Sequence, residues 1–435
     1  MAPERLSALD ASFLYLERPA MHMHVAALSV FDPSTRPDGR LRSEDVAAVI
    51  ASRIHLAPRF RQKAMSIPWN VALPVWVDDP HFDLDFHVRR AGLPSPGGRR
   101  ELTDYAQRIL SRPLDRTKPL WELYVIEGLE GGHVAALLKV HHAIFDGVSG
   151  MQLAAAREAL FEQLTHPVQA FVNAVDQVVR APATTAFGLG VIATGVRSIF
   201  DMGTRPKSPL DVRIGPNRRF AMTEAPLQRF KDVKDALGGT VNDVVLTVVA
   251  GALHSLLKAR KEPTRGRTLR VMVPVSVRAS GEEGAGNRVA PAFVDIPVGA
   301  VSPKRRLAEV RKGTRHLKES MMAMGADAII SLGAYAPGGL LAGAARLVSR
   351  GPWFNLVVSN IPGPQQPMYL AGARLVASYP SMPLGENSAL SIACSSLGGT
   401  MAFGLTGDWD GMPDILALAF AIDGSLDELC KAVGV

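Results

Sequence analysis

The hydrophobic pattern of the first part of the chain predicts alternating strands and helices. Residues 21–31 form a β-rich run, MHMHVAALSVF, and residues 43–54 and 103–110 have helical spacing. The run HVAALLKVHH at 133–142 is apolar without a clear period of two, as expected of a strand that is covered on both faces. The alanines and leucines of the following segment, 147–164, favour a helix.

The second half repeats this alternation. Thr240 and Asp243 have the spacing of a capping box. The residues that follow would be apolar on every side of a helix, which predicts a largely buried helix. Further strands are predicted at residues 269–278, 287–298, 354–363 and 390–408.

Length and composition divide the chain into two domains. At 435 residues the chain is too long for one ordinary core, and its 47% hydrophobic content excludes global disorder. Between residues 166 and 213 the pattern loosens into Gly- and Ala-rich and then Pro- and Lys-containing sequence. We therefore predict an α/β protein with domains at 1–165 and 214–435, connected by 166–213.

Cysteine content and the N-terminus favour a cytoplasmic location. Cys394 and Cys430 cannot build a disulfide framework or a cysteine-rich zinc site, and no N-terminal stretch has a signal-peptide pattern. The net charge of +7 suits an anionic partner, which could be nucleic acid, a phosphorylated cofactor or a membrane face. Residues 328–345 come closest to membrane-spanning length, but Pro337 and several glycines interrupt them, so a surface or core segment is favoured.

The stretch HHAIFDG, residues 141–147, carries the candidate chemistry. Neighbouring side chains on a strand point to opposite faces, so His141 and His142 do not converge on one metal ion. General-base work needs only one well-placed imidazole. In this interpretation one histidine faces a cavity, the other is tied into the structure, Asp146 lies where the chain turns, and Gly147 permits an unusual backbone conformation.

The alternative is that the histidine pair only satisfies hydrogen bonds at a strand end. The added Asp-Gly, between a long apolar strand and a helix, favours the catalytic interpretation. The sequence has no Gly-x-Ser-x-Gly elbow and no phosphate loop ending in Gly-Lys-Ser/Thr, so neither a serine nucleophile nor a nucleotide-driven reaction is indicated.

HHAIFDG resembles the HHxxxDG motif of the CoA-dependent acyltransferase superfamily. Further stretches resemble the bacterial wax ester synthase/acyl-CoA:diacylglycerol acyltransferase family, in matching order from about residue 6 to residue 413. They are LSALDASFLYLE, KPLWELYVIEGL, TVNDVVLTVVAGAL, VPVSVR, SNIPGP and, more weakly, GDWDGMP. Together with HHxxxDG these stretches make the resemblance specific.

The resemblance implies two similar chloramphenicol-acetyltransferase-like domains, with mixed sheets flanked by helices and a tunnel between them. His142 is implied to face the tunnel and His141 to be structural. Asp146 is implied to hold its loop through an ion pair, for which Arg278 in VPVSVR is the candidate.

The implied reaction is direct acyl transfer from acyl-CoA, a co-substrate, to diacylglycerol or a long-chain alcohol. His142 would act as general base, without an acyl-enzyme, a metal or a resident cofactor. Asn242, at the start of the buried helix, could serve the site or the oxyanion, or could simply start the helix. Asn360 in SNIPGP could line the tunnel, although its position favours shaping the turn before Pro362.

Two alternatives keep the same fold. One is a carrier-dependent, condensation-type acyltransferase, which the lack of a neighbouring carrier module disfavours. The other is a non-catalytic lipid-binding protein, which the intact HHxxxDG disfavours. The residues that bind CoA cannot be named from the sequence.

The lipid substrates make peripheral membrane or lipid-droplet contact sensible on the cytoplasmic side. Residues 302–321 predict a helix capped by Ser302, with seven Lys or Arg and two Glu outside a narrow inward stripe. That stripe is Leu307, Val310, Thr314, Leu317 and Met321. A solvated surface is the favoured interpretation of the basic faces. The alternatives are binding to CoA phosphates or to an anionic membrane surface. The Gly-rich apolar stretches at 187–196 and 329–345 could touch lipid or pack in helices. No aromatic interleaving or known module supports nucleic-acid binding.

Overall fold

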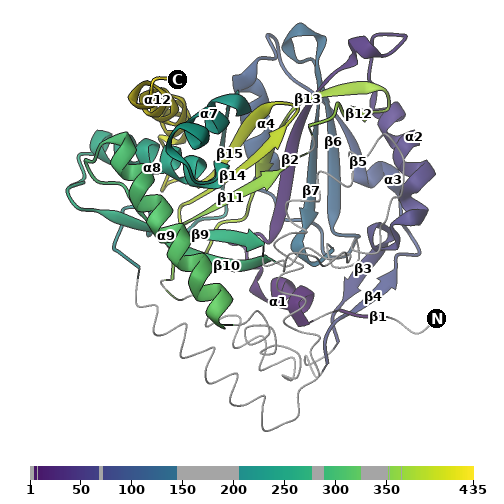
Figure 1. The fold of residues 1–435 in the computed structure, drawn as a ribbon. Helices are drawn as coiled ribbons and strands as arrows, with labels where there is room; N and C mark the ends of the chain where they lie inside the picture. The colour runs from purple at the N-terminus through teal and green to yellow at the C-terminus, as the bar shows by residue number, and fades with distance from the viewer. Residues whose placement is uncertain are drawn as a thin grey trace.

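Two six-stranded mixed sheets stand side by side in the computed structural model, which describes residues 4–6, 8–67, 72–144, 205–276, 289–324, 351, 353–363 and 365–435 (Figure 1). The predicted helix at 147–164 and the apolar stretches at 187–196 and 328–345 lie outside these residues. The α/β class with mixed sheets is confirmed.

The first sheet has the order β12-β13-β2-β7-β6-β5. Its central strands are the two predicted apolar runs, β2 (His24–Asp32) and β7 (Val134–His141), which pair antiparallel with His24 opposite His141. Every residue of β7 is buried, as predicted for a strand covered on both faces. The remaining strands are β6 (Trp121–Glu127), β5 (Val88–Gly92), β13 (Ala373–Ser381) and β12 (Tyr369–Leu370).

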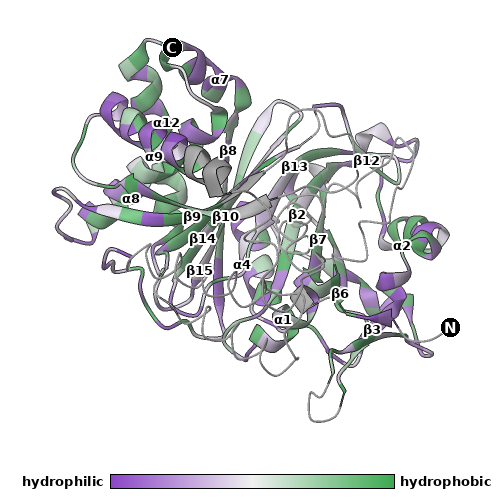
Figure 2. Ribbon diagram, turned by 60° about the horizontal axis from the view of Figure 1, so that its bottom comes forward, coloured by the Kyte–Doolittle hydropathy of each residue, from purple (hydrophilic) through white to green (hydrophobic). Residues whose placement is uncertain are grey.

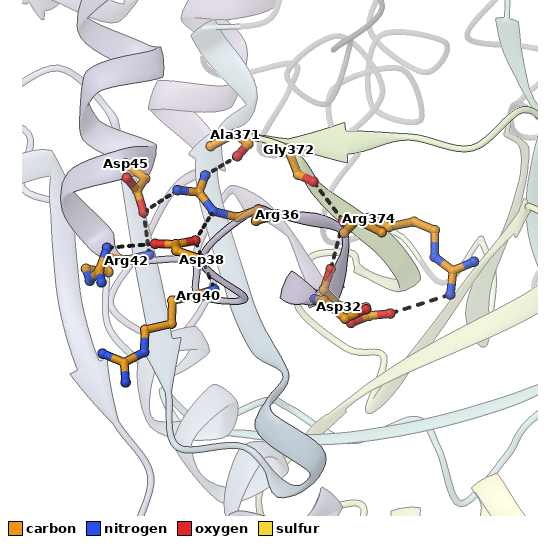
Figure 3. Close-up of polar contacts among 11 residues, drawn as sticks. Asp32, Arg36, Asp38, Arg40, Arg42, Asp45, Ala371, Gly372 and Arg374 are labelled. Carbon is orange, nitrogen blue, oxygen red and sulfur yellow. Dashed lines mark hydrogen bonds and ion pairs between the residues drawn. The ribbon is translucent and has the colours of Figure 1, made fainter.

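Strands β12 and β13 come from the C-terminal half of the sequence but belong to this first sheet, where β13 pairs with β2. The predicted division at 166–213 did not include this exchange. A polar cluster holds the β12–β13 turn (Figure 3). The Arg36 guanidinium donates to the Ala371 carbonyl and pairs with Asp38 and Asp45. Arg374 in turn pairs with Asp32 at 3.6 Å.

The second sheet has the order β10-β9-β11-β14-β15-β8. Its strands are β10 (Val289–Pro297), β9 (Thr268–Ser276), β11 (Leu356–Pro362), β14 (Leu390–Leu397), β15 (Thr400–Asp408) and β8 (Arg218–Pro226). Five of these strands match segments predicted as strands: β9 at 269–278, β10 at 287–298, β11 at 354–363, and β14 and β15 at 390–408. Helices pack on this sheet: α7 (Leu227–Leu237), α8 (Val241–Ala259), α9 (Pro303–Met324) and α12 (Ile415–Val433). Figure 2 shows largely hydrophobic strands inside and mixed colours on these outer helices.

Helix α8 begins as predicted. The Thr240 backbone N–H donates to Asp243 Oδ2 at 2.8 Å, and the Asp243 N–H donates to Thr240 Oγ1 at 3.2 Å, which completes the capping box. Within the described residues α8 alone is long and apolar enough to span a bilayer, but 72% of that window is buried in the protein. Its packing against α9, α12 and the second sheet explains its apolar surface.

The two sheets meet where β13 crosses β15. A Cβ on Gly404 would lie 1.9 Å from the Pro380 carbonyl oxygen, so only glycine allows the two backbones to approach so closely. Beside this contact the Ser381 and Thr406 hydroxyls hydrogen-bond at 2.8 Å. The exchanged strand therefore fixes the position of one sheet against the other.

The remaining elements surround the first sheet. Helix α4 (Arg99–Leu110) packs between the first sheet and β8, and α2 (Ser43–Arg53) covers the outer side. Helix α1 (Ala8–Leu16) lies near the ends of β2 and β7 in Figure 1. The others are α3 (Leu84–His87), the small sheet of β1 (Glu4–Arg5), β4 (Val75–Asp78) and β3 (Gln62–Met65), and the 3-10 turns Pro33–Thr35, Ile54–Leu56, Pro58–Arg61 and Glu130–Gly132.

Helix α9 corrects one expectation. We expected all seven of its basic residues to lie outside the buried stripe, but Arg306 is buried beside Leu307. Its guanidinium donates to the carbonyls of Pro297 and Gly299, at 3.3 and 3.2 Å. The prediction failed because these carbonyl acceptors follow strand β10 and meet the helix only in the folded chain.

Candidate active site

The end of β7 separates two environments. Leu138 and Val140 face an apolar cluster that includes α1, whereas Leu137 faces the cluster formed with α4. Because side chains on a strand point to opposite faces, the alternation holds as far as His141, the last residue of β7, and His142 begins a short 3-10 turn. His142 follows Leu138 and Val140, and His141 follows Lys139. The two rings have different neighbours: His142 stacks on Phe13, whereas His141 lies beside Glu17.

His142 lies directly after β7 on the apolar side. Its backbone N–H donates to the Met23 carbonyl at 2.9 Å, and its ring stacks on Phe13 with 4.6 Å between centroids and 25° between planes. The residue is 1% exposed. Burial lowers the pKa of His142 to about 3, so the imidazole is neutral near pH 7 and is in the form that accepts a proton.

His141 ends β7 on the other side. Its Nδ1 accepts a hydrogen bond from the Ala143 backbone N–H at 3.0 Å, and its Nε2 lies 3.7 Å from Glu17 Oε2. Burial, with the neighbouring charges of His142 and Arg116, holds the pKa of His141 well below its usual value. His141 is therefore a neutral ring built into the turn that carries His142.

A buried ion pair continues this polar side. Lys139 Nζ lies 3.0 Å from Glu122 Oε2 on β6 and also donates to the Arg112 carbonyl at 3.0 Å, just beyond α4. Arg89 on β5 approaches the same carboxylate at 3.1 Å. Sequence reasoning missed this pair, although a lysine inside the apolar run at 133–142 was a signal that a partner was needed.

Sequence reasoning also missed two further buried histidines. His22 precedes β2, and His24 is its first residue. His24 Nε2 lies 3.2 Å from the Leu110 carbonyl oxygen at the end of α4, and His22 Nε2 lies 3.0 Å from the Pro216 carbonyl oxygen. Arg218, on β8, donates to the Ala20 carbonyl. The period-two MHMH pattern was the available signal, and these contacts join the first sheet to the chain that enters the second.

Several predicted site residues lie outside the described residues. They are Asp146, Gly147 and Arg278, so the Asp146–Arg278 ion pair stays a prediction.

The structure places Asn242 and Asn360 in regular elements. Asn242 is half-buried in the first turn of α8, and no recorded contact between described residues joins it to the histidines. Asn360 lies inside β11, where its Oδ1 accepts from Cys394 Sγ at 3.5 Å. The favoured turn-shaping role of Asn360 is therefore wrong, because the strand continues to Pro362.

Metal binding was disfavoured from the sequence. In the part of the chain that the structure describes, no group of three or more His, Cys, Asp or Glu side chains could hold a metal ion.

Comparison with protein families covers most of the chain. The wax ester synthase/diacylglycerol acyltransferase catalytic domain matches residues 6–158 and 155–245, and the WS/DGAT C-terminal domain matches residues 285–430. The match to the catalytic domain includes the strand β7 and both histidines.

Curated relatives match over nearly their full length. A Mycobacterium tuberculosis protein named as a diacylglycerol O-acyltransferase is 33% identical over 501 residues, which cover 99% of this chain and 98% of the relative. A Mycobacterium bovis protein with the same name is 33% identical over 451 residues, with 98% of each chain covered.

Solved structures agree with these matches. The wax ester synthase/diacylglycerol acyltransferase from Marinobacter aquaeolei VT8 superposes with a TM-score of 0.75 at 28% identity, over 99% of this chain and 100% of that one. The first condensation domain of the calcium-dependent antibiotic synthetase shares the fold, with a TM-score of 0.59 at 15% identity over 98% of this chain and 96% of that one. The resemblance seen in the sequence is confirmed: this acyltransferase belongs to the wax ester synthase/diacylglycerol acyltransferase family.

Proposed function

We propose that the protein transfers a long-chain acyl group from acyl-CoA to the hydroxyl of diacylglycerol or of a long-chain alcohol. The buried, neutral imidazole of His142 carries this proposal, because it lies at the end of β7 in a chain of this family. Acyl-CoA is a co-substrate in this scheme. The chemistry requires no resident cofactor, because the thioester is already activated.

In the proposed reaction His142 removes the hydroxyl proton while the alcohol oxygen bonds to the thioester carbon. The resulting tetrahedral oxyanion collapses and the carbon–sulfur bond breaks. The CoA thiolate then takes the proton from the His142 imidazolium, so that ester and CoA thiol leave and the base is restored. Asn242 remains a candidate for stabilising the oxyanion.

The test is release of CoA thiol by purified protein from long-chain acyl-CoA, with and without diacylglycerol or hexadecanol. His142→Ala should lower acceptor-dependent release about 10² to 10⁴-fold, the usual worth of a positioned general base. The matched control is His133→Ala, which removes a half-buried ring immediately before β7, at the opposite end of that strand, and should retain the rate.

Equal release by the wild type and a folded His142→Ala protein would show that His142 is not the base. If CoA release by the wild type does not depend on an acceptor, or if no CoA is released, a carrier-dependent donor or a lipid-binding role would be favoured instead. Comparing the two acceptors assigns triacylglycerol or wax ester synthesis.

We also propose that the protein works at the cytoplasmic surface of a membrane or lipid body. The proposed acceptors reside in bilayers, and α9 exposes Lys304, Lys312 and Arg315 on its outer side. A cation near an anionic lipid surface contributes about 1 kcal/mol to binding.

Flotation with phosphatidylcholine vesicles, with and without phosphatidylglycerol, tests this surface. Changing the three α9 cations to glutamine should weaken binding to anionic vesicles by roughly tenfold or more. The control removes the same amount of charge elsewhere. It changes Arg100 and Arg108 on α4, and the exposed Arg112 just beyond that helix, to glutamine. Equal losses in both variants would mean that net charge, rather than α9, determines binding.

A further inference from the structure

The end of helix α1 touches both histidines. Phe13 stacks on the His142 ring, and Glu17, four residues later, approaches the His141 ring. The Glu17 backbone N–H donates to the Phe13 carbonyl at 3.1 Å, so the helical geometry extends one residue beyond Leu16. Residues four apart on a helix lie on the same side, which lets one turn of α1 support the whole pair.

Glu17 reaches both histidines by different routes. Its Oε2 lies 3.7 Å from His141 Nε2 and 3.9 Å from Arg116 Nε, and its carboxylate accepts a hydrogen bond from the Met23 backbone N–H. The carbonyl of Met23 accepts from the His142 backbone N–H at 2.9 Å. Through its own N–H and C=O, Met23 thus connects the carboxylate to the backbone of His142.

The contacts of the two ring nitrogens favour one tautomer of His141. Its Nδ1 accepts the Ala143 N–H, so the proton of the neutral ring is on Nε2, the atom that faces Glu17. A carboxylate beside Nε2 favours this tautomer because it attracts an N–H and repels a lone pair. The other tautomer would leave the Ala143 N–H without its acceptor.

We propose that Glu17 is a positioning residue: it holds His141 in the Nε2–H tautomer and supplies the negative charge that stabilises His142 when that ring is protonated. The proposal rests on the proposed role of His142 as base. It also assigns a purpose to the LDASFLYLE stretch, in which Phe13 and Glu17 would support the two histidines.

Charge balance explains why an anion is needed here. A proton accepted by His142 creates a cation in an apolar, buried site, where an uncompensated charge is costly. The neighbouring groups on the polar side are Arg116, Lys139 and His24, and the other carboxylate, Glu122, is already paired with Lys139 and Arg89. Burial raises the pKa of Glu17, while Arg116, the Met23 N–H and Lys139 lower it.

The first test compares Glu17→Gln, which keeps the shape and removes the charge, with Glu17→Asp, which keeps the charge. Glu17→Gln should lower kcat for acceptor-dependent CoA release about 10 to 100-fold, the usual effect of losing a group that orients a reactive residue, and leave KM for acyl-CoA unchanged. Glu17→Asp should recover part of the rate. The control is Glu127→Gln, which makes the same change at the last residue of β6.

The pH profile distinguishes a positioning role of Glu17 from a general loss of structure in the variant. Removing the carboxylate lowers the pKa of His142, so the acid limb of kcat/KM should move to lower pH in Glu17→Gln and return toward the wild-type position in Glu17→Asp. A folded Glu17→Gln protein with wild-type kcat and an unchanged acid limb would overturn the proposal.

A second measurement does not depend on activity. Nitrogen-15 NMR of histidine-labelled protein, with the His141 signal assigned from a His141→Gln variant, reports the tautomer directly. We expect Nε2–H in the wild type and a mixture of tautomers in Glu17→Gln. The same tautomer in both proteins would refute the role of Glu17 even if acyl transfer is confirmed. Conversely, a wild type without CoA release would reject the proposed function and leave the tautomer result standing.

Discussion

The two sides of β7 differ in what surrounds adjacent histidines. On one side His142 meets Phe13 and the apolar residues Leu138 and Val140. On the other, His141 meets Glu17, with the Lys139–Glu122 pair behind it. Both rings are buried, but only the second lies among buried charges.

This difference teaches how one strand can combine opposite requirements. In the proposed reaction a long acyl chain would need apolar walls, because leaving water lowers the free energy of a hydrocarbon chain. A base that becomes charged needs nearby polar groups. Because the side chains of a strand alternate, β7 can supply an apolar wall on one face and a charged support on the other.

The largest effect on stability is expected on the charged side. Lys139→Met leaves the buried Glu122 carboxylate with Arg89 and the Tyr124 hydroxyl as partners, and losing one partner of a buried pair typically costs about 3–5 kcal/mol. Urea unfolding at pH 7 measures the change. The double variant Lys139→Met/Glu122→Leu should lose less than Lys139→Met alone. A larger loss in the double variant would mean that the ion pair is not the cause.

The apolar side should respond through packing alone. Leu138→Ala removes a buried side chain of the cluster around Phe13, and such changes cost about 2–5 kcal/mol according to how far the cavity collapses. Urea unfolding should give the same loss at pH 6 and pH 8. A strong pH dependence of this loss would show that the two sides are coupled.

Acid should act mainly through the buried histidines. Burial lowers the pKa of His22, His24, His87, His141 and His142 below the ordinary 6.5. Below pH 6.5 the unfolded chain therefore binds protons that the folded chain excludes, and stability falls as pH decreases. Glu17, whose pKa is raised, acts in the opposite direction at lower pH.

The slope of unfolding free energy between pH 6 and pH 5 measures this effect. Each such histidine contributes up to about 1.4 kcal/mol per pH unit. His24→Gln, whose amide nitrogen can take the place of Nε2 and donate to the Leu110 carbonyl, should flatten the slope. An unchanged slope in His24→Gln would place the acid sensitivity elsewhere, and His133→Gln is the control for losing any histidine.

The smallest effect is expected away from both sides, in the polar cluster that holds the β12–β13 turn. Arg374→Ala removes a half-exposed pair with Asp32, which is worth about 0–1 kcal/mol. A loss above this range in thermal unfolding would show that the exchanged strand depends on this ion pair more than on its backbone pairing with β2.

Local patterns predicted the regular elements well. The Thr240–Asp243 spacing gave the start of α8, because a capping box involves only neighbouring residues. The apolar run at 133–142 gave β7. Arg306 and Asn360 were misjudged because their surroundings come from other elements, the carbonyls after β10 and the partner strand β14.

The sequence by itself predicted β7 and the opposite faces of its successive residues, because the period of two belongs to every extended strand. It also determined the family, through motifs spread over most of the chain. Only the tertiary structure decided which face is charged, because Glu17, Glu122 and Lys139 lie on three different elements. It alone placed β13 beside β2, since pairing between distant strands depends on how both halves pack, which no local pattern records.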